Sequence, residues 1–259
     1  MKRFKTLCTI ALTAVLALGT VACGTDDNTN TGGDTGKKKI VMGTSADYKP
    51  YEFHDTAKGG EVAGFDVDIA KSIADQLGYQ LEIKDMDFNG LIPALQAGTV
   101  DFVMAGMTPT AERKQSVDFS DIYYEAKNTI VAKKGANLKT ADTLSGKKVA
   151  VQLGSIQETA AKDMKGLNIV PLNKTGEIIQ EIKAGRVDAA IIEDTVAKGF
   201  VKANPDLEFN TIPNTDEAGS AIAFPKNSKI TADFNKALQG MKDSGQIDTF
   251  AKNWFDAAE

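Results

Sequence analysis

The chain has 259 residues, of which 42% are hydrophobic and 25% are charged, and its formal net charge is −5. These values are typical of a soluble globular protein with one large domain or two modest ones. No basic cluster favours a nucleic-acid partner, and no apolar segment is long enough to place a permease or receptor span in the same chain.

The N-terminal segment predicts an export signal. Its first five residues include three basic ones and precede an apolar run over 7–18, too short for a membrane span but right for a secretory signal. The tetrapeptide at 21–24, Val-Ala-Cys-Gly, resembles the lipobox of bacterial lipoproteins. That resemblance implies a signal peptide over 1–22, cleavage before Cys23, and lipid (palmitate) on its sulfur. Ordinary cleavage near Ala22, which would leave a free thiol, is the alternative.

Residues 23–37 are polar and rich in Gly and Thr, and they predict a flexible tether. About 15 such residues have a root-mean-square span of roughly 20 Å, so the folded part would sit just outside the cell membrane, on its extracellular or periplasmic side. Loss of the signal lowers the basic count from 30 to 27 against 35 acids, a net charge of −8. With Cys8 removed and Cys23 lipidated, no thiol or disulfide remains, so packing must supply the stability.

From Lys38 onward, short apolar runs alternate with amphipathic stretches, which predicts an α/β fold. In the first helix we expect Asp66 as the N-cap and Gly78 as the stop. In chain order the expected elements are strand 39–45, helix 64–78, strand 79–86, helix 89–98, strand 100–106, a helix opening after Thr110, strands 128–134 and 147–152, helix 155–164, strand 168–172, helix 176–185, strand 187–192, helix 194–204, strand 220–225 and helices 229–244 and 246–257.

Two stretches echo each other. Residues 95–106 and 182–193 share the order helix, Ala-Gly, any residue, Val-Asp, buried strand. Glycine ends helices and valine starts strands in any α/β protein, so the similarity of the two stretches can be explained without a shared function. Two similar lobes that face a shared cleft would explain it equally well. Ligands of open α/β sheets bind beyond the carboxyl ends of strands, which points to residues 105–108 and 192–194.

Arg113 lies in the first turn of a helix that Thr110 would cap. A guanidinium fork can hold both oxygens of a carboxylate, and the exposed N–H groups at a helix start, with the Thr108 hydroxyl nearby, favour an anion. An ion pair with Glu112 or Asp118 is the structural alternative.

The second half of the chain offers complementary groups. Gly154 and Ser155 form a strand-to-helix turn where the Ser155 side chain and the Ile156 amide could meet an anion, although simple capping explains the turn as well. Glu193 ends an apolar strand and suits an ammonium group. The alternative is a surface acid that opens the next helix, with Asp194 as its cap.

Aromatic residues follow two strands of the first half. Tyr48 and Phe88 sit among polar neighbours, where they could wall an alkyl or cationic group, whereas Phe53 fits a core position. Nothing predicts an enzyme: the one histidine, His54, lies in a polar turn that we expect to be exposed, and no nucleophile-base pair, metal-ligand set or phosphate loop is present. We therefore expect no catalytic residue, no metal and no cofactor.

From about Lys38 onward the chain resembles the polar amino-acid-binding proteins of bacterial ABC importers, the family-3 solute-binding proteins. The stretches that carry the resemblance are GTSADYKPYEF, GFDVDIAKSIA, MDFNGLIPALQAG, AGMTPTAERKQSVDFSDIYY, VAVQLGS and the final WF. It implies a two-lobed, type II periplasmic-binding-protein-like α/β fold with two hinge crossings that closes over one amino acid. It also implies a monomer that works with membrane permease subunits and uses no nucleic acid.

The resemblance implies a role for each matching residue. Those assigned to the ligand carboxylate are Arg113, Thr108, Ser155 and Ile156, and those assigned to its amino group are Gly106, Thr108 and Glu193, with Asp194 as the alternative to Glu193. The side-chain pocket would comprise Tyr48, Phe88, Ser45, Asp47, Gln152 and Gln157. Relatives that bind basic ligands often have an acid at Ser45, a place that Asp47 could take, so glutamine and arginine or another basic amino acid both stay open.

The two expected hinge crossings, about which the lobes would close, define the expected domain limits. Lobe one would comprise 38–124 and 220–259, and lobe two 125–219, with crossings near 123–127 and 217–220. Carboxylate and ammonium partners divided between lobes would couple affinity to hinge closure. Two other classes fit such a fold: an enzyme related to the dehydratases of aromatic amino-acid synthesis, and a receptor or adhesin without a transport role.

Overall fold

The computed structural model describes residues 36–214 and 219–256. The expected signal peptide, Cys23, and all of the tether but its last two residues lie outside this part, as do residues 217 and 218 of the second crossing. None of the helices within the described ranges is long and apolar enough to cross a membrane.

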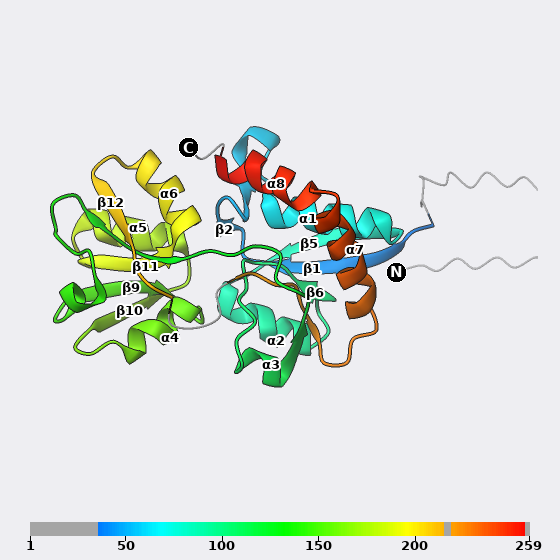
Figure 1. Cartoon of the computed structure of the whole chain (residues 1–259), viewed down its shortest axis with the longest axis horizontal. Coiled ribbons are helices and arrows are strands. Elements are labelled where there is room, and N and C mark those ends of the chain that lie inside the picture. The colour runs from blue at the N-terminus through cyan, green and yellow to red at the C-terminus, as the bar shows by residue number, and fades with distance from the viewer. Residues whose placement is uncertain (1–35, 215–218, 257–259) are drawn as a thin grey trace, which may run out of the picture. The chain divides into compact units, whose positions relative to one another are not determined.

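The first lobe is built on a five-stranded sheet in the order β5-β1-β6-β13-β7. Figure 1 labels β5, β1 and β6 of this sheet. Its strands are β1 (Lys38–Thr44), β5 (Tyr79–Asp85), β6 (Phe102–Val103), β7 (Val117–Phe119) and β13 (Ala223–Pro225). Strand β1 pairs in parallel with β5 and β6, whereas β13 is antiparallel to β6 and β7. The late strand β13 therefore returns the chain to the sheet in which it began.

Alternating side chains of β1 separate the two faces of this sheet, as the period of two requires. Ile40 and Met42 pack with α1 (Phe65–Gln76), α7 (Thr231–Asp243) and α8 (Gln246–Phe255). Val41 packs on the other face with α2 (Leu91–Gln96). Both faces are thus covered by helices, which explains why these strands are apolar runs.

The second lobe is built on a sheet in the order β10-β9-β11-β8-β12. Its strands are β8 (Asn128–Lys133), β9 (Lys148–Gln152), β10 (Asn168–Leu172), β11 (Ala189–Glu193) and β12 (Leu207–Thr211). Strands β9, β10 and β11 are parallel, and β8 runs antiparallel between β11 and β12. One face packs on α5 (Thr175–Ala184) and α6 (Asp194–Ala203), and the other on α4 (Ile156–Asp163).

Three features differ from the expected elements. A small sheet of β2 (Asp47–Tyr48), β3 (Glu52–Asp55) and β4 (Glu61–Ala63) follows β1, and neither β7 nor β12 is expected from the sequence. Asp66 is not the N-cap of α1, because Gly64 holds that position and Asp66 is buried in the first turn. Short helical turns complete the fold: η1 (Thr56–Lys58), η2 (Phe88–Gly90), α3 (Arg113–Ser116) and η3 (Ala141–Leu144).

The two segments that connect the lobes lie side by side. The Tyr123 amide donates to the Ser220 carbonyl at 2.9 Å and the Ser220 amide to the Tyr124 carbonyl at 2.8 Å, in an antiparallel bridge. Gly219 has φ of 133°, and a Cβ there would lie 2.7 Å from the Ile122 side chain. Glycine is thus required for the two crossings to approach this closely.

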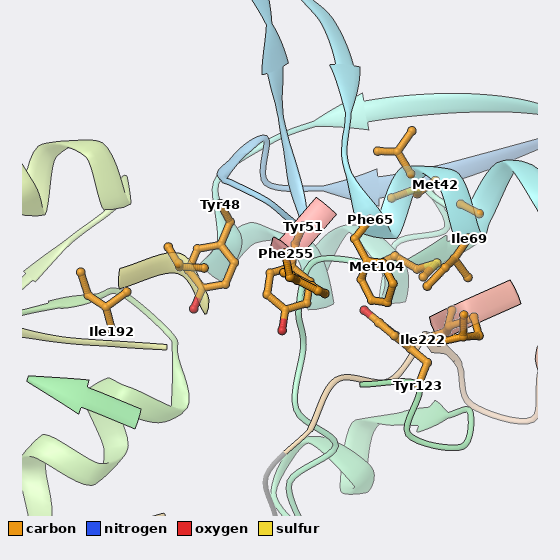
Figure 2. Packing of buried hydrophobic residues seen from close by; sticks show 14 of the residues in the cluster. Met42, Tyr48, Tyr51, Phe65, Ile69, Met104, Tyr123, Ile192, Ile222 and Phe255 are labelled. Atoms are coloured by element: carbon orange, nitrogen blue, oxygen red, sulfur yellow. The ribbon is translucent and has the colours of Figure 1, made fainter. Parts of the chain in front are cut away.

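An aromatic cluster supports the crossings from the first lobe. Tyr124 stacks on Phe255 of α8 with ring centroids 4.4 Å apart, and Phe255 also contacts Phe65 at 4.9 Å and Tyr51 at 5.1 Å. Figure 2 shows Tyr51, Phe65 and Phe255 together, with the Tyr123 hydroxyl pointing toward them. The C-terminal helix therefore fixes the first crossing through its last aromatic residue.

Candidate functional site

A cleft of about 840 Å³ is lined by residues of both lobes. Six of the residues predicted for a ligand site line it, namely Thr108, Arg113, Ser155, Ile156, Gln157 and Glu193. Ser220 of the second crossing also lines it, so the cleft reaches the segments that connect the lobes. The structure therefore brings together the groups expected to bind opposite charges.

Arg113 reaches from the first lobe to the second. Its Nη1 donates to the Thr108 carbonyl at 2.8 Å and its Nη2 to the Gly154 carbonyl at 2.9 Å. The guanidinium carbon lies 5.4 Å from the centre of the Phe88 ring, within the range of a cation–π contact. Burial lowers the pKa of Arg113 to about 10, so the group stays protonated at neutral pH.

The structural alternative for Arg113, an ion pair within its own segment, is absent from the described part of the chain. No carboxylate lies within 4.0 Å of the guanidinium there. Asp118 binds Lys226 at 2.9 Å and the Asn227 amide at 2.7 Å instead. Thr110 is not the N-cap of α3, because Glu112 holds that position and the regular helix begins only at Arg113, but the Thr110 hydroxyl still accepts from the Arg113 amide at 3.2 Å.

The turn between β9 and α4 faces Arg113 from the second lobe. Ser155 is buried and caps α4, accepting from the Glu158 amide at 3.1 Å, so the capping alternative is realised. Gly154 has φ of 79° and packs against Asn89 of the first lobe, where a Cβ would lie 3.1 Å from the Asn89 Cβ. Ile156 opens α4, and its amide has no acceptor among the described residues. A free amide at this helix start can still meet an anion in the cleft.

Glu193 is the last residue of β11 and lines the cleft from the second lobe. It is 7% exposed, and one carboxylate oxygen accepts from the Thr195 hydroxyl at 2.6 Å. Burial raises the pKa of Glu193 to about 7, an effect that the Thr195 and Tyr51 hydroxyls oppose. No lysine or arginine pairs with Glu193 in the described part of the chain. The buried carboxyl is therefore a place where a cation would be strongly favoured.

Asp194, the alternative to Glu193, is committed to the backbone. Its Oδ1 accepts from the Lys127 amide at 3.1 Å and from the Thr195 amide at 3.0 Å. Asp194 is thus the first residue of α6, whose N-cap is Glu193, and its side chain ties that helix to the first crossing.

Gly106 follows β6 and has φ of 56°. Its amide donates to the Asp66 carboxylate at 2.9 Å, and a Cβ on it would lie 3.3 Å from the Tyr48 ring. Tyr48 is buried and stacks on Tyr51 with ring centroids 5.8 Å apart. The conformation of Gly106 therefore depends on a bare Cα and on the carboxylate beneath it.

Three of the residues predicted for the ligand side chain, Ser45, Asp47 and Gln152, lie near contacts between the segment after β1 and the second lobe. Ser45 donates to Asp47 at 2.9 Å, and Asp47 accepts from the Thr175 amide of the second lobe at 2.6 Å. Burial raises the pKa of Asp47, and the Thr175 and Ser45 hydrogen bonds counter it. Gln152 is buried near the Asn173 carbonyl.

Gln157 lies apart from that group. It donates to Asn128 at 2.8 Å and lines the main cleft.

Sequence reasoning missed three residues that shape the site. Lys174 pairs with Asp87 at 3.0 Å and lies 3.7 Å from Asp47, so it crosses between the lobes. Glu52 and Asp66 are fully buried carboxyls behind Gly106. The stretch GFDVDIA places two acids at the start of a helix, which could have indicated a special role for Asp66. A capping role accounts for that pattern equally well, however. His54, by contrast, is exposed as predicted and binds Asp85 at 3.0 Å.

Comparison with known proteins shows the family. The model of the bacterial extracellular solute-binding proteins, family 3, matches residues 40–257. The chain is 48% identical to the arginine-binding extracellular protein ArtP of Bacillus subtilis strain 168, across 95% of this chain and 96% of that protein. It is 32% identical to the glutamine-binding protein GlnH of an ABC transporter from the same strain, across 100% of both chains.

Solved structures show the same fold. The amino acid ABC transporter substrate-binding protein AbpA from Streptococcus pneumoniae, bound to L-arginine, superposes with a TM-score of 0.81 at 38% identity, over 86% of this chain and 97% of that one. The substrate-binding protein of another amino acid ABC transporter gives 0.81 at 47% identity, over 84% and 99%. These matches confirm the predicted two-lobed, type II periplasmic-binding-protein fold. The chain belongs to the bacterial extracellular solute-binding proteins, family 3.

Proposed function

We propose that the protein binds a free amino acid, L-arginine first among the candidates, and presents it to the permease subunits of an ABC importer. The observation that carries the proposal is a pair of opposite charges in one cleft. Arg113 in the first lobe and Glu193 in the second both line the cleft, and neither has an ion-pair partner among the described residues. A zwitterion supplies a carboxylate for one and an ammonium for the other.

We assign the ligand carboxylate to Arg113 with Thr108, Ser155 and the Ile156 amide. A carboxylate is a stronger acceptor than a carbonyl, so it would replace the Gly154 carbonyl on Nη2 of Arg113. The binding energy of a molecule with so few atoms depends on matching each charge with a fixed partner.

We assign the ammonium to Glu193, the Gly106 carbonyl and the Thr108 hydroxyl. The commitment of Asp194 to backbone amides supports Glu193 over Asp194. Because each charge of the ligand would have partners in both lobes, ligand binding would favour closure about the crossings.

We rank arginine above glutamine for two reasons. The relative at 48% identity is named for arginine, whereas the glutamine-binding relative is 32% identical. Asp47 and Asp87 place two carboxylates near Ser45 and Phe88, where the ligand side chain would lie, and Lys174 offsets them only from a partly exposed position. Acids beside an aromatic wall suit a guanidinium better than a neutral amide.

We propose the lobe limits expected from the sequence, 38–124 with 220–259 and 125–219. The bridge between Tyr124 and Ser220 supports hinges at these crossings. We further propose that Cys23, outside the described residues, carries the lipid anchor, and that the protein is a monomer that binds its ligand without changing it chemically.

A thermal-shift screen of the twenty amino acids, followed by calorimetry, tests the binding proposal. A ligand at 100 times its dissociation constant adds about 2.7 kcal/mol to the free energy of unfolding. We expect arginine to give the largest shift and Arg113→Ala to abolish it, with an unchanged circular dichroism spectrum. Arg186→Ala is the matched control, because that exposed arginine pairs with Glu181 and does not line the cleft, so the variant should bind ligand normally. Retained arginine affinity in Arg113→Ala would contradict the carboxylate assignment.

A further inference from the structure

Two buried carboxyl groups, Glu52 and Asp66, lie behind the Gly106 loop and the first crossing. Both side chains are fully buried. One Asp66 oxygen, Oδ2, accepts from the Gly106 amide at 2.9 Å and from the Tyr123 hydroxyl at 2.8 Å. Tyr123 is also the residue whose amide binds Ser220 in the second crossing. Asp66 thus connects the loop assigned to the ligand ammonium with both crossings.

The backbone at the start of α1 brings Glu52 beside Asp66. The Phe65 amide donates to the Pro50 carbonyl at 3.0 Å, and the Asp66 amide to the Tyr51 carbonyl at 3.0 Å. A Cβ on Gly64 would lie 2.1 Å from the Tyr51 carbonyl oxygen, so only glycine permits this approach. The first amides of the helix are therefore satisfied by residues 50 and 51, and Glu52 follows directly beside Asp66.

Three of the four carboxyl oxygens of Glu52 and Asp66 lack a hydrogen-bond donor in the described part of the chain unless one of the two carboxyls is protonated. Neither oxygen of Glu52, nor Oδ1 of Asp66, has a hydrogen-bond partner among the described residues. The Asp66 amide binds the carbonyl of Tyr51, the residue next to Glu52, so the two buried carboxyls lie close together, and two adjacent carboxylates away from water cannot both be ionised. One O–H from Glu52 to Asp66 would satisfy an oxygen on each residue and leave a single negative charge.

The surrounding charges decide which carboxyl keeps the proton. Burial, and then the charges of Asp66, Asp47 and Glu193, raise the pKa of Glu52 well above its usual value. Burial also raises the pKa of Asp66, to about 6, but its bonds from Gly106, Tyr123 and Glu52 oppose that rise.

The other neighbouring groups that titrate are the hydroxyls of Tyr48, Tyr51 and Tyr123. Burial raises the pKa of each hydroxyl, so all three stay neutral. The proton therefore belongs on Glu52, and the negative charge on Asp66.

We infer that Glu52 and Asp66 share one proton and act together as positioning residues for the ligand. Glu52 donates to Asp66, and Asp66 in turn holds the Gly106 amide and the Tyr123 hydroxyl. Gly106 keeps its left-handed conformation, with its carbonyl aimed at the ligand ammonium, only while this carboxylate is in place. The ligand part of the inference rests on the proposed function, whereas the shared proton does not.

The proton is tested without ligand, by infrared spectroscopy of the full chain at pH 8. We expect the C=O stretch of a protonated carboxylic acid, shifted in deuterium oxide, and we expect Glu52→Gln to remove it. Glu193→Gln should keep the band, because Glu193 is mostly ionised at that pH. A wild-type spectrum without the band, or a band that persists in Glu52→Gln, would overturn the shared proton whether or not the protein binds an amino acid.

The positioning role is tested by arginine calorimetry on two variants of Glu52. Glu52→Leu removes the donor to Asp66 and should weaken binding about tenfold at pH 8, the effect of one lost hydrogen bond to a charged group. Glu52→Gln supplies an N–H donor in place of the O–H and should recover most of that affinity. Asp68→Asn is the matched control, because Asp68 lies in the same turn of α1 but accepts from Trp254 at 2.7 Å.

A pH series separates positioning from general damage to the fold. In Glu52→Leu the Asp66 carboxylate has lost a donor, so its pKa should rise and the affinity should fall further between pH 8 and pH 6 than in the wild type. In Glu52→Gln the fall should match the wild type. Parallel pH profiles in all three proteins, or equal loss in Glu52→Leu and Glu52→Gln, would refute positioning. A protein that binds no amino acid but shows the infrared band would refute the proposed function alone.

Discussion

Ligand affinity should depend steeply on pH, because the group assigned to the ammonium titrates near neutrality. Burial raises the pKa of Glu193 to about 7, and an ammonium beside it would pull that pKa far below its value in the free protein. Below pH 7 the ligand must therefore expel a proton before it binds. The apparent affinity should fall tenfold for each pH unit in that range, or about 100-fold from pH 8 to pH 5.

The assay is calorimetry with arginine from pH 5 to pH 8 in buffers of different ionisation enthalpy. We expect about one proton released per ligand at pH 6 and almost none at pH 8. Glu193→Gln should lose about 2–5 kcal/mol of binding free energy at pH 8 and most of the pH dependence. Asp194→Asn is the control for the neighbouring acid and should keep the wild-type slope.

Two results would refute this reasoning. Equal affinity at pH 5 and pH 8 in the wild type would show that no buried carboxyl titrates on binding. A wild-type slope in Glu193→Gln together with a flat profile in Asp194→Asn would transfer the role to Asp194. Asp66, with a pKa of about 6, adds only a second and lower step to the expected curve.

The same titration fixes the sign of the stability change. A carboxyl with a pKa of 4.5 in the unfolded chain and about 7 in the folded one binds protons more tightly when folded. Its contribution to stability is therefore present below pH 4.5 and is lost as the pH rises to 7, at a cost of about 3 kcal/mol for complete burial. Arginine should offset that cost, so the ligand-induced rise in melting temperature should be larger at pH 8 than at pH 5.

Three further changes have expected outcomes. Gly106→Ala should weaken arginine binding and cost about 1–2 kcal/mol of stability, since its φ of 56° disfavours a Cβ, and unchanged calorimetry and denaturation would contradict this. Lys174→Met removes a partly exposed ion pair between the lobes and should speed ligand release by no more than about fivefold, measured by stopped flow; a larger change would mean that Lys174 touches the ligand. Cys23→Ala should move the protein from the membrane fraction to the soluble fraction, and unchanged fractionation would refute lipidation.

The sequence predicts long elements well because their patterns are repeated many times. The expected strand 168–172 is β10 residue for residue, and the two C-terminal helices begin within two residues of their predicted starts. Strands β2, β3 and β4 escape prediction because two to four residues carry no measurable alternation. The close approach of Gly64, just after β4, to the Tyr51 carbonyl, just before β3, is likewise a contact between segments that no local pattern encodes.

The same difference between local patterns and distant contacts decides which site residues can be predicted from the sequence. Arg113, Thr108, Ser155 and Glu193 can be chosen from the sequence because each follows a strand or opens a helix, and the structure places all four on one cleft. Glu52 cannot be chosen in this way. Its importance arises only from burial beside Asp66, which depends on how three distant segments fold against one another.

Arg113 shows why a cation at the start of a helical turn is tolerated here. The macrodipole of a regular helix disfavours a cation at its N-terminus, but α3 has only four residues and the positive end it could present is small. The guanidinium instead faces two carbonyls, Thr108 in one lobe and Gly154 in the other. A bound carboxylate would exchange a neutral acceptor for a charged one at the point where the lobes meet. The same interaction that recognises the ligand would therefore also hold the cleft closed.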